Sequence, residues 1–162
     1  MKRKQDGPAL PADNGARSYL VRDYMTATVT TLKDDARLLD AALLIRRTGR
    51  RHVPIVTEAG ALVGIISDRD VSRMAPSMLA RMTPDEYNQI FEATPITIAM
   101  TKNPLTVGPE TPIRDAVQLF YEKKIGALVV TDGEKVVGIL TVTDMLGLLN
   151  ELLSRQANAA GA

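Results

Sequence analysis

One short pattern of residues that could do chemistry occurs twice in this chain. Residues 62–70 read LVGIISDRD, and residues 136–144 read VVGILTVTD. Each is an apolar run of strand type with an internal glycine, Gly64 or Gly138, and each ends in a hydroxyl followed three residues later by a carboxylate. A strand that leads into a helix would deliver both groups to equivalent places in the two halves of the chain.

The pattern has two interpretations. In the first, Ser67 and Thr141 are helix N-caps, and Asp70 and Asp144 occupy the third helical position, where the helix dipole favours a carboxylate. In the second, the carboxylate accepts hydrogen bonds from both hydroxyls of a ribose, while the side-chain hydroxyl and free backbone N–H groups face a phosphate. The strand glycine then lets a ligand approach the backbone closely, although it also fits a β-bulge. The residues alone leave both interpretations open.

The first copy carries positive charge beside this pattern. Arg69 lies inside the serine-to-aspartate segment, and Arg51 and His52 directly precede a predicted strand. Both segments end at the same edge of a predicted hairpin, so these side chains favour a phosphate site, with arginine suited to bidentate contact. Arg46 and Arg47 stand at the end of a predicted helix, where we expect solvated cations that complement the dipole.

The second copy lacks these cations. Thr143 takes the place of the arginine, and Gly126 and Ala127 take the place of the Arg-His pair. Its site should therefore select less strongly for anions.

Catalytic chemistry has little support in the sequence. His52 is the single histidine and cysteine is absent, so a metal site or a general base there would lack partners. Asp68 and Asp70 are two residues apart near a helix start and do not face each other. Neither a P-loop nor a dinucleotide-type glycine-rich loop is present. We predict a non-catalytic regulatory module that needs no cofactor and holds no metal.

Composition narrows the class further. The 20 basic and 19 acidic residues give a net charge of +1, which does not favour nucleic-acid binding. With 45% hydrophobic and 24% charged residues the chain reads as an ordinary globular protein. The longest apolar runs fall well short of the roughly 20 residues that cross a bilayer, and the N-terminus does not read as a secretory signal. We expect a cytoplasmic protein with no membrane contact.

The whole folded part reads as two copies of one unit. Met25-Thr26 recurs as Met100-Thr101, 75 positions later, and the glycine strand recurs at 74 positions after a deletion in a turn. The first copy predicts strands at 29–32, 53–57 and 62–67, a helix at 36–48 that ends at Gly49, and a helix from 68. The second predicts strands at 105–107, 127–131 and 136–141 and helices at 112–123 and 142–153. Thr111 caps the first of these helices, with Pro112 at its first position. Helices at 84–91 and at 95–100, each starting at a Thr-Pro pair, lie between the copies.

These elements predict an α+β fold of two intertwined repeats. Each copy leaves an apolar sheet face that cannot easily stand alone, so the copies should pack about a pseudo-twofold axis. We divide the chain into an N-terminal tail (1–17), repeat 1 (18–74), a helical connector (75–95), repeat 2 (96–153) and a C-terminal tail (154–162).

In this order, the residues resemble a tandem pair of cystathionine β-synthase (CBS) domains, also called a Bateman module. The resemblance lies in five segments: VRDYMT at 21–26, RHVPIV at 51–56, GIISDRD at 64–70, IGALVV at 125–130 and GILTVTD at 138–144. The resemblance implies βαββα repeats, two clefts, a disc-shaped homodimer, and binding of AMP, ADP, ATP or S-adenosylmethionine in order to regulate a partner protein. A structural dimerisation or partner-binding module with empty sites is the alternative.

The resemblance also implies roles for particular residues. Asp70 and Asp144 hold the ribose, Ser67 and Thr141 lie by the ribose or phosphate, and Arg51, His52 and Arg69 meet the phosphate, with Thr143 at the equivalent position. Adenine would sit against Thr28, Val29, Thr30, Val53 and Pro54 in one cleft and against Pro104, Leu105, Thr106, Ala127 and Leu128 in the other. Val129 replaces the family's usual proline and the second cleft lacks cations, so we expect one good site and one weak or empty site.

Overall fold

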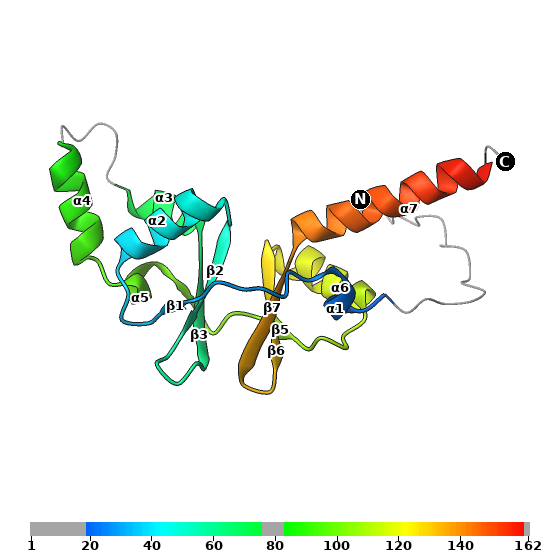
Figure 1. Ribbon diagram of the computed structural model, residues 1–162, viewed down its shortest axis with the longest axis horizontal. Coiled ribbons are helices and arrows are strands. Elements are labelled where there is room, and N and C mark those ends of the chain that lie inside the picture. The colour runs from blue at the N-terminus through cyan, green and yellow to red at the C-terminus, as the bar shows by residue number, and fades with distance from the viewer. Residues whose placement is uncertain (1–18, 76–82, 161–162) are drawn as a thin grey trace, which may run out of the picture.

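A computed structural model describes residues 19–75 and 83–160, and its elements repeat once along the chain (Figure 1). The first half contains α1 (Val21–Tyr24), β1 (Leu32–Lys33), α2 (Leu38–Thr48), β2 (His52–Val56), β3 (Leu62–Ser67) and α3 (Asp68–Met74). After α4 (Pro84–Ala93), the second half contains α5 (Ile96–Ala99), β4 (Thr101–Lys102), β5 (Thr106–Val107), α6 (Ile113–Lys123), β6 (Ala127–Asp132), β7 (Lys135–Thr141) and α7 (Val142–Ala160). The predicted α+β class is confirmed, with helix α4 between the two halves, and the tail expected at 1–17 lies outside the described residues.

Local sequence explains several element ends. Helix α2 stops at Gly49, whose φ of 68° is the left-handed C-cap that glycine adopts without strain. Helix α4 starts with a capping box between Thr83 and Glu86, with Pro84 in its first turn. The β6–β7 turn contains Gly133 at φ 59°. These ends agree with the predictions because each depends on one or two neighbouring residues.

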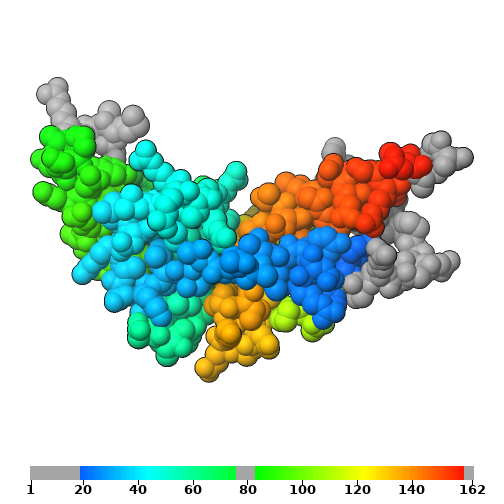
Figure 2. All heavy atoms as spheres, viewed as in Figure 1, coloured from blue at the N-terminus to red at the C-terminus, as the bar shows by residue number. Residues whose placement is uncertain are grey.

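The two halves complete each other's sheets. One sheet has the order β1-β2-β3-β4 and the other the order β5-β6-β7. Strand β4 pairs antiparallel with β3 of the first half, where Thr101 lies opposite Ile65. In the same way Thr26, which precedes β1, pairs antiparallel with Ile139 of β7. This exchange confirms the intertwined, pseudo-twofold arrangement, and the chain between α1 and β1 crosses from one half to the other (Figures 1 and 2).

The helices lie on the outer side of each sheet, and the sheets meet in the middle (Figure 1). The first core joins β2, β3 and α2 to Phe91 of α4 and Ile96 of α5. The second joins β6, β7 and α6 to Val21 of α1. The opposite sheet faces are also buried, although their residues belong to neither core: Pro54, Val56, Val129 and Ile139. The sheets therefore cover each other.

The strand glycines make room for exchanged methionines. A Cβ built on Gly64 would lie 2.4 Å from Sδ of Met100, and one built on Gly138 would lie 2.3 Å from Sδ of Met25. Each methionine belongs to the half of the chain opposite to that of its glycine, and it precedes the segment that pairs with the glycine's strand. Packing between the halves, rather than close approach of a ligand, therefore accounts for glycine at these two positions.

Three helices start at other residues than the sequence predicted, because other segments of the chain bond to their first turns. Pro112 is the N-cap of α6 rather than its first helical residue, and the N–H of Ile113 donates to the Tyr19 carbonyl at 2.8 Å. Equivalently, Pro95 caps α5, and the N–H of Ile96 donates to the Ala36 carbonyl at 3.0 Å. Backbone hydrogen bonds from the other half therefore set these two starts. Helix α2 begins at residue 38 rather than 36, and the N–H of Leu38 donates to the Thr94 carbonyl at 2.9 Å.

Two further expectations need correction. The strand expected at 29–32 is β1 at Leu32–Lys33, because parallel pairing begins with Leu32 opposite Ile55. The tail expected from 154 is helical through Ala160, because glycine and proline are absent from 148–160 and Glu151 pairs with Arg155 one turn along. Within the described parts of the chain, each helix is too short or too polar to cross a membrane.

Candidate functional site

Each repeated hydroxyl and carboxylate forms a capping box. The N–H and Oγ of Ser67 donate to Oδ2 of Asp70 at 2.9 and 2.6 Å, and the N–H of Asp70 donates back to Oγ at 3.3 Å. Thr141 and Asp144 repeat this arrangement at 2.7, 2.7 and 3.3 Å. The helix-start interpretation is therefore confirmed at both positions.

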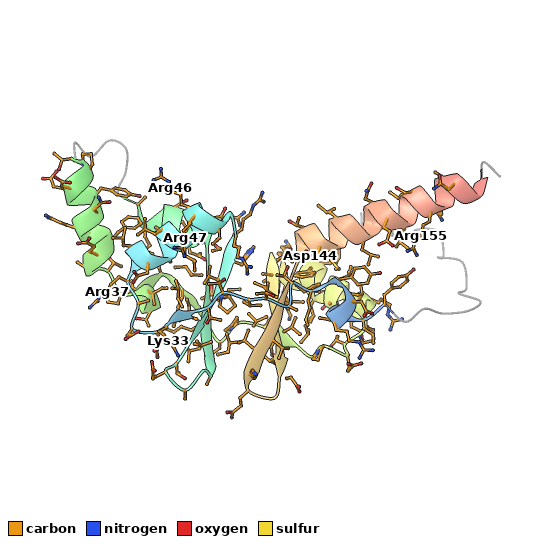
Figure 3. The ribbon with its side chains drawn as sticks, viewed as in Figure 1. Lys33, Arg37, Arg46, Arg47, Asp144 and Arg155 are labelled. Carbon is orange, nitrogen blue, oxygen red and sulfur yellow. The ribbon has the colours of Figure 1, made fainter. Side chains whose placement is uncertain are left out.

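The capping boxes leave part of each carboxylate for a ligand. Both boxes engage Oδ2, and Oδ1 of Asp70 lies 3.9 Å from a guanidinium nitrogen of Arg73. The Asp70 side chain is 20% exposed, and Asp144 is half-buried at the start of α7 (Figure 3). Capping and hydrogen bonding to a ligand hydroxyl are thus compatible within one carboxylate.

The cations of the first repeat gather at the same sheet edge as its carboxylate. His52 at the start of β2 lies opposite Ser67 at the end of β3. The N–H of Asp68 donates to the Arg51 carbonyl at 3.1 Å, so Arg51 is joined to the start of α3, which contains Arg69. Both arginine side chains are exposed. Repeat 1 therefore brings Arg51, His52 and Arg69 to the sheet edge that holds Asp70.

Burial lowers the pKa of His52 from its ordinary value of 6.5. The negative charges of Asp68 and Asp70 act in the opposite direction, and the positive charges of Arg51 and Arg69 lower the pKa further. The imidazole is therefore neutral at pH 7 and stands among charges of both signs.

The equivalent edge of the second repeat has the same backbone and fewer charges. Ala127 lies opposite Thr141, and the N–H of Val142 donates to the Gly126 carbonyl at 3.1 Å. Thr143 is exposed at the position that matches Arg69. The two repeats thus share one framework and differ in the side chains that would meet an anion.

The segments predicted to hold an adenine differ in exposure. Thr28, Thr30, Leu105 and Thr106 are exposed, and Val29, Pro104 and Ala127 are half-buried. Val53, Pro54 and Leu128 are fully buried, with Val53 and Leu128 inside the two cores. These three residues are therefore packed inside the protein and not on an open surface.

Sequence reasoning missed one residue here. A guanidinium nitrogen of Arg50 donates to the Thr28 carbonyl at 2.8 Å and so ties the loop before β1 to the end of α2. The cluster of arginines at 46–51 gave a signal for a cation here, but no sequence pattern indicated that Arg50 bonds to the loop before β1. Arg46 and Arg47 are exposed, which agrees with a solvated position (Figure 3).

Within residues 19–75 and 83–160, histidine, aspartate and glutamate side chains form no group of three that could hold a metal ion.

Comparisons with known proteins agree with this framework. Uncharacterized protein MJ1404 from Methanocaldococcus jannaschii is 34% identical over 114 residues, which are 70% of this chain and 25% of that protein. The chain thus spans about a quarter of this curated relative. The CBS-pair protein CBSX2 from Arabidopsis thaliana, solved in complex with AMP, is 26% identical with a TM-score of 0.67, covering 83% of this chain and 98% of CBSX2.

A second solved structure shares the arrangement. The CBS domain pair of protein MJ0100, in complex with 5′-methylthioadenosine and S-adenosyl-L-methionine, is 28% identical with a TM-score of 0.68, covering 82% of this chain and 96% of that one. The family model described as "CBS domain" matches residues 21–76 and 96–151, one match in each half of the fold. This chain therefore belongs to the CBS-domain family and contains a tandem pair of CBS domains.

Proposed function

We propose that this chain is a non-catalytic regulatory module that binds an adenine nucleotide, AMP, ADP or ATP, beside Asp70 in the first repeat. The observation that carries the proposal is the gathering of Arg51, His52 and Arg69 at the sheet edge that holds the Ser67–Asp70 capping box. Oδ1 of Asp70 accepts a ribose hydroxyl, and the guanidinium groups bind the phosphate.

Charge favours a phosphate-bearing ligand over S-adenosylmethionine. The pair MJ0100 was solved with S-adenosyl-L-methionine and CBSX2 with AMP, so related folds accept either. The sulfonium of S-adenosylmethionine is a cation and would meet two arginines here, whereas a phosphate forms charge-assisted hydrogen bonds with them. S-adenosylmethionine is therefore the alternative ligand, and the second repeat is the weak or empty site.

A structural role is the alternative function, and the capping boxes favour it. If Asp70 and Asp144 serve only the helix starts, the module dimerises or binds a partner protein with both sites empty. In that case a substitution at Asp70 changes the free energy of unfolding without changing any ligand affinity.

Isothermal titration of the full chain with AMP, ADP, ATP and S-adenosylmethionine distinguishes nucleotide binding, S-adenosylmethionine binding and a structural role. We expect affinity of about micromolar order for a phosphate-bearing ligand. Asp70→Asn keeps one carbonyl oxygen for the cap but loses the charge and one acceptor, so affinity should fall about tenfold to hundredfold. The matched control Asp144→Asn should change it little. Failure of all four ligands to bind wild type would establish the structural role instead.

The non-catalytic role has its own test. Incubation with each nucleotide, followed by separation of the products, should recover the nucleotide unchanged. Turnover that persists in independent preparations and disappears in Asp70→Asn would show an enzyme.

We further propose that the module acts as a homodimer, with α7 against α7 of a second copy. Four exposed apolar side chains follow α7 at spacings of four, three and four residues: Val142, Leu146, Leu149 and Leu153, which are 39–60% exposed. This is the spacing of a two-stranded helical seam. Leu148 faces the chain's own core, and Glu151 and Arg155 pair with each other away from the seam, so a second copy meets no like charges there. The regulated partner protein and a cytoplasmic location also stay predictions.

A further inference from the structure

The histidine of the first repeat touches the second repeat at a glycine. A Cβ built on Gly126 would lie 3.1 Å from Nε2 and 3.4 Å from Cε1 of His52, and these two are the only atoms within 4 Å among the described residues apart from chain neighbours. Gly126 does not have a left-handed φ, so its backbone does not require glycine. The missing side chain at 126 leaves the space that the imidazole occupies.

Both partners in this contact are fixed to the candidate sites of their own repeats. The backbone of His52 pairs with Ser67, the N-cap of α3. The Gly126 carbonyl accepts the N–H of Val142, the first residue of α7. The contact therefore joins the phosphate side of the first site directly to the helix start of the second.

The contact between His52 and Gly126 has no symmetry-related counterpart, because the pseudo-twofold axis relates these residues to residues of other types. The residue that matches Gly126 in the first repeat is Arg51, and the residue that matches His52 in the second is Ala127. The large side chains, a guanidinium and an imidazole, thus come from repeat 1, and the small residues come from repeat 2. Repeat 2 supplies space rather than ligands.

We propose that Gly126 is a positioning residue for the nucleotide site of the first repeat, because the space at 126 sets the orientation of the His52 ring beside Asp70 and Arg69. Repeat 2 thereby controls the affinity of repeat 1 without contacting the ligand. This inference rests on the proposed nucleotide binding.

A Cβ at 126 would lie closer to Nε2 than an ordinary contact allows, so the ring must shift by a few tenths of an ångström. We expect Gly126→Ala to weaken AMP binding about threefold to tenfold, as when one ligating side chain leaves its preferred rotamer, and Gly126→Val to weaken it further. The control is Gly147→Ala in α7, where a Cβ meets nothing within 4 Å. In a His52→Ala background Gly126→Ala should have no further effect, because a residue that acts only through the ring cannot act without it.

Because His52 is the only histidine, its proton resonances can be followed without ambiguity. Gly126→Ala should move the His52 resonances and their titration in the absence of nucleotide, and AMP should move them in wild type. AMP binding that Gly126→Ala leaves unchanged, or that it weakens equally with and without His52, overturns the inference and leaves the proposed function standing. Absence of AMP binding to wild type overturns both.

Discussion

Replacing the strand glycines tests how the two repeats hold together. In Gly138→Ala the new Cβ would lie 2.3 Å from Sδ of Met25, and in Gly64→Ala 2.4 Å from Sδ of Met100. Ordinary contacts are about 3.5–4.0 Å, so each sulfur must move by more than about 1 Å. Both methionines pack against a core, and overpacking of this kind costs about 1–3 kcal/mol. For a chain of this size that lowers Tm by roughly 2–12 °C.

Urea unfolding followed by circular dichroism measures the cost. The control Gly147→Ala lies in an open part of α7 and should stabilise the helix by up to about 1 kcal/mol. Combining Gly138→Ala with Met25→Ala should cost less than the sum of the two single changes, because the smaller side chain vacates the space. If Gly64→Ala and Gly138→Ala unfold at the wild-type urea concentration, the packing argument is refuted. Lost nucleotide affinity at unchanged stability would instead favour close approach of a ligand.

Three further outcomes are expected. Arg69→Thr, which copies Thr143 of the second repeat, should weaken ATP binding about tenfold or more in titration calorimetry and spare S-adenosylmethionine. The pKa of His52 is lowered in the folded state, so its contribution to stability is present above about pH 6.5 and is lost as the pH falls through the lowered value. The free energy of unfolding in urea should therefore decrease from about pH 8 to about pH 5, and His52→Gln should remove this decrease. Leu146→Glu should convert a dimer to a monomer in sedimentation, whereas Glu151→Gln should not.

Sequence reasoning found the elements whose causes are local. The β-branched runs of β3 and β7, the glycine that ends α2 and the capping box of α4 each depend on a few adjacent residues. The repeat itself was visible because Gly64 and Gly138 recur within matching strands. Local causes and duplication were therefore enough to predict the fold class.

The sequence did not predict the short elements that each half contributes to the other. Helix α1 has four residues and β4 has two, too few for any periodicity to appear. Their positions depend on partners far along the chain, as when the Thr111 carbonyl accepts the N–H of Val21. One signal was present: the recurrence of Met25-Thr26 as Met100-Thr101 marked both segments as equivalent, but spacing alone did not say that each methionine packs on the other repeat.

At the site, the sequence predicted that Arg51, His52 and Arg69 share one sheet edge but could not assign side-chain directions. Val53 and Leu128 were expected beside an adenine, yet their side chains fill the cores. Strand neighbours alternate between faces, and a continuous apolar run does not reveal which face is which. The contact between His52 and Gly126 joins residues 74 positions apart, and no local sequence pattern predicts it.

The pattern of divergence between the repeats argues for where function resides. Both repeats keep the methionine-on-glycine packing and the hydroxyl–carboxylate cap, so these features are demanded by folding in each half. The repeats differ at the sheet edge, where repeat 1 has Arg51, His52 and Arg69 and repeat 2 has Gly126, Ala127 and Thr143 at the equivalent positions. A purely structural module has no need of charge on one side of its axis, since solvated cations contribute little to stability. The anion proposed for repeat 1 would give that asymmetry a physical reason, and the glycine opposite His52 would then position a residue of that site.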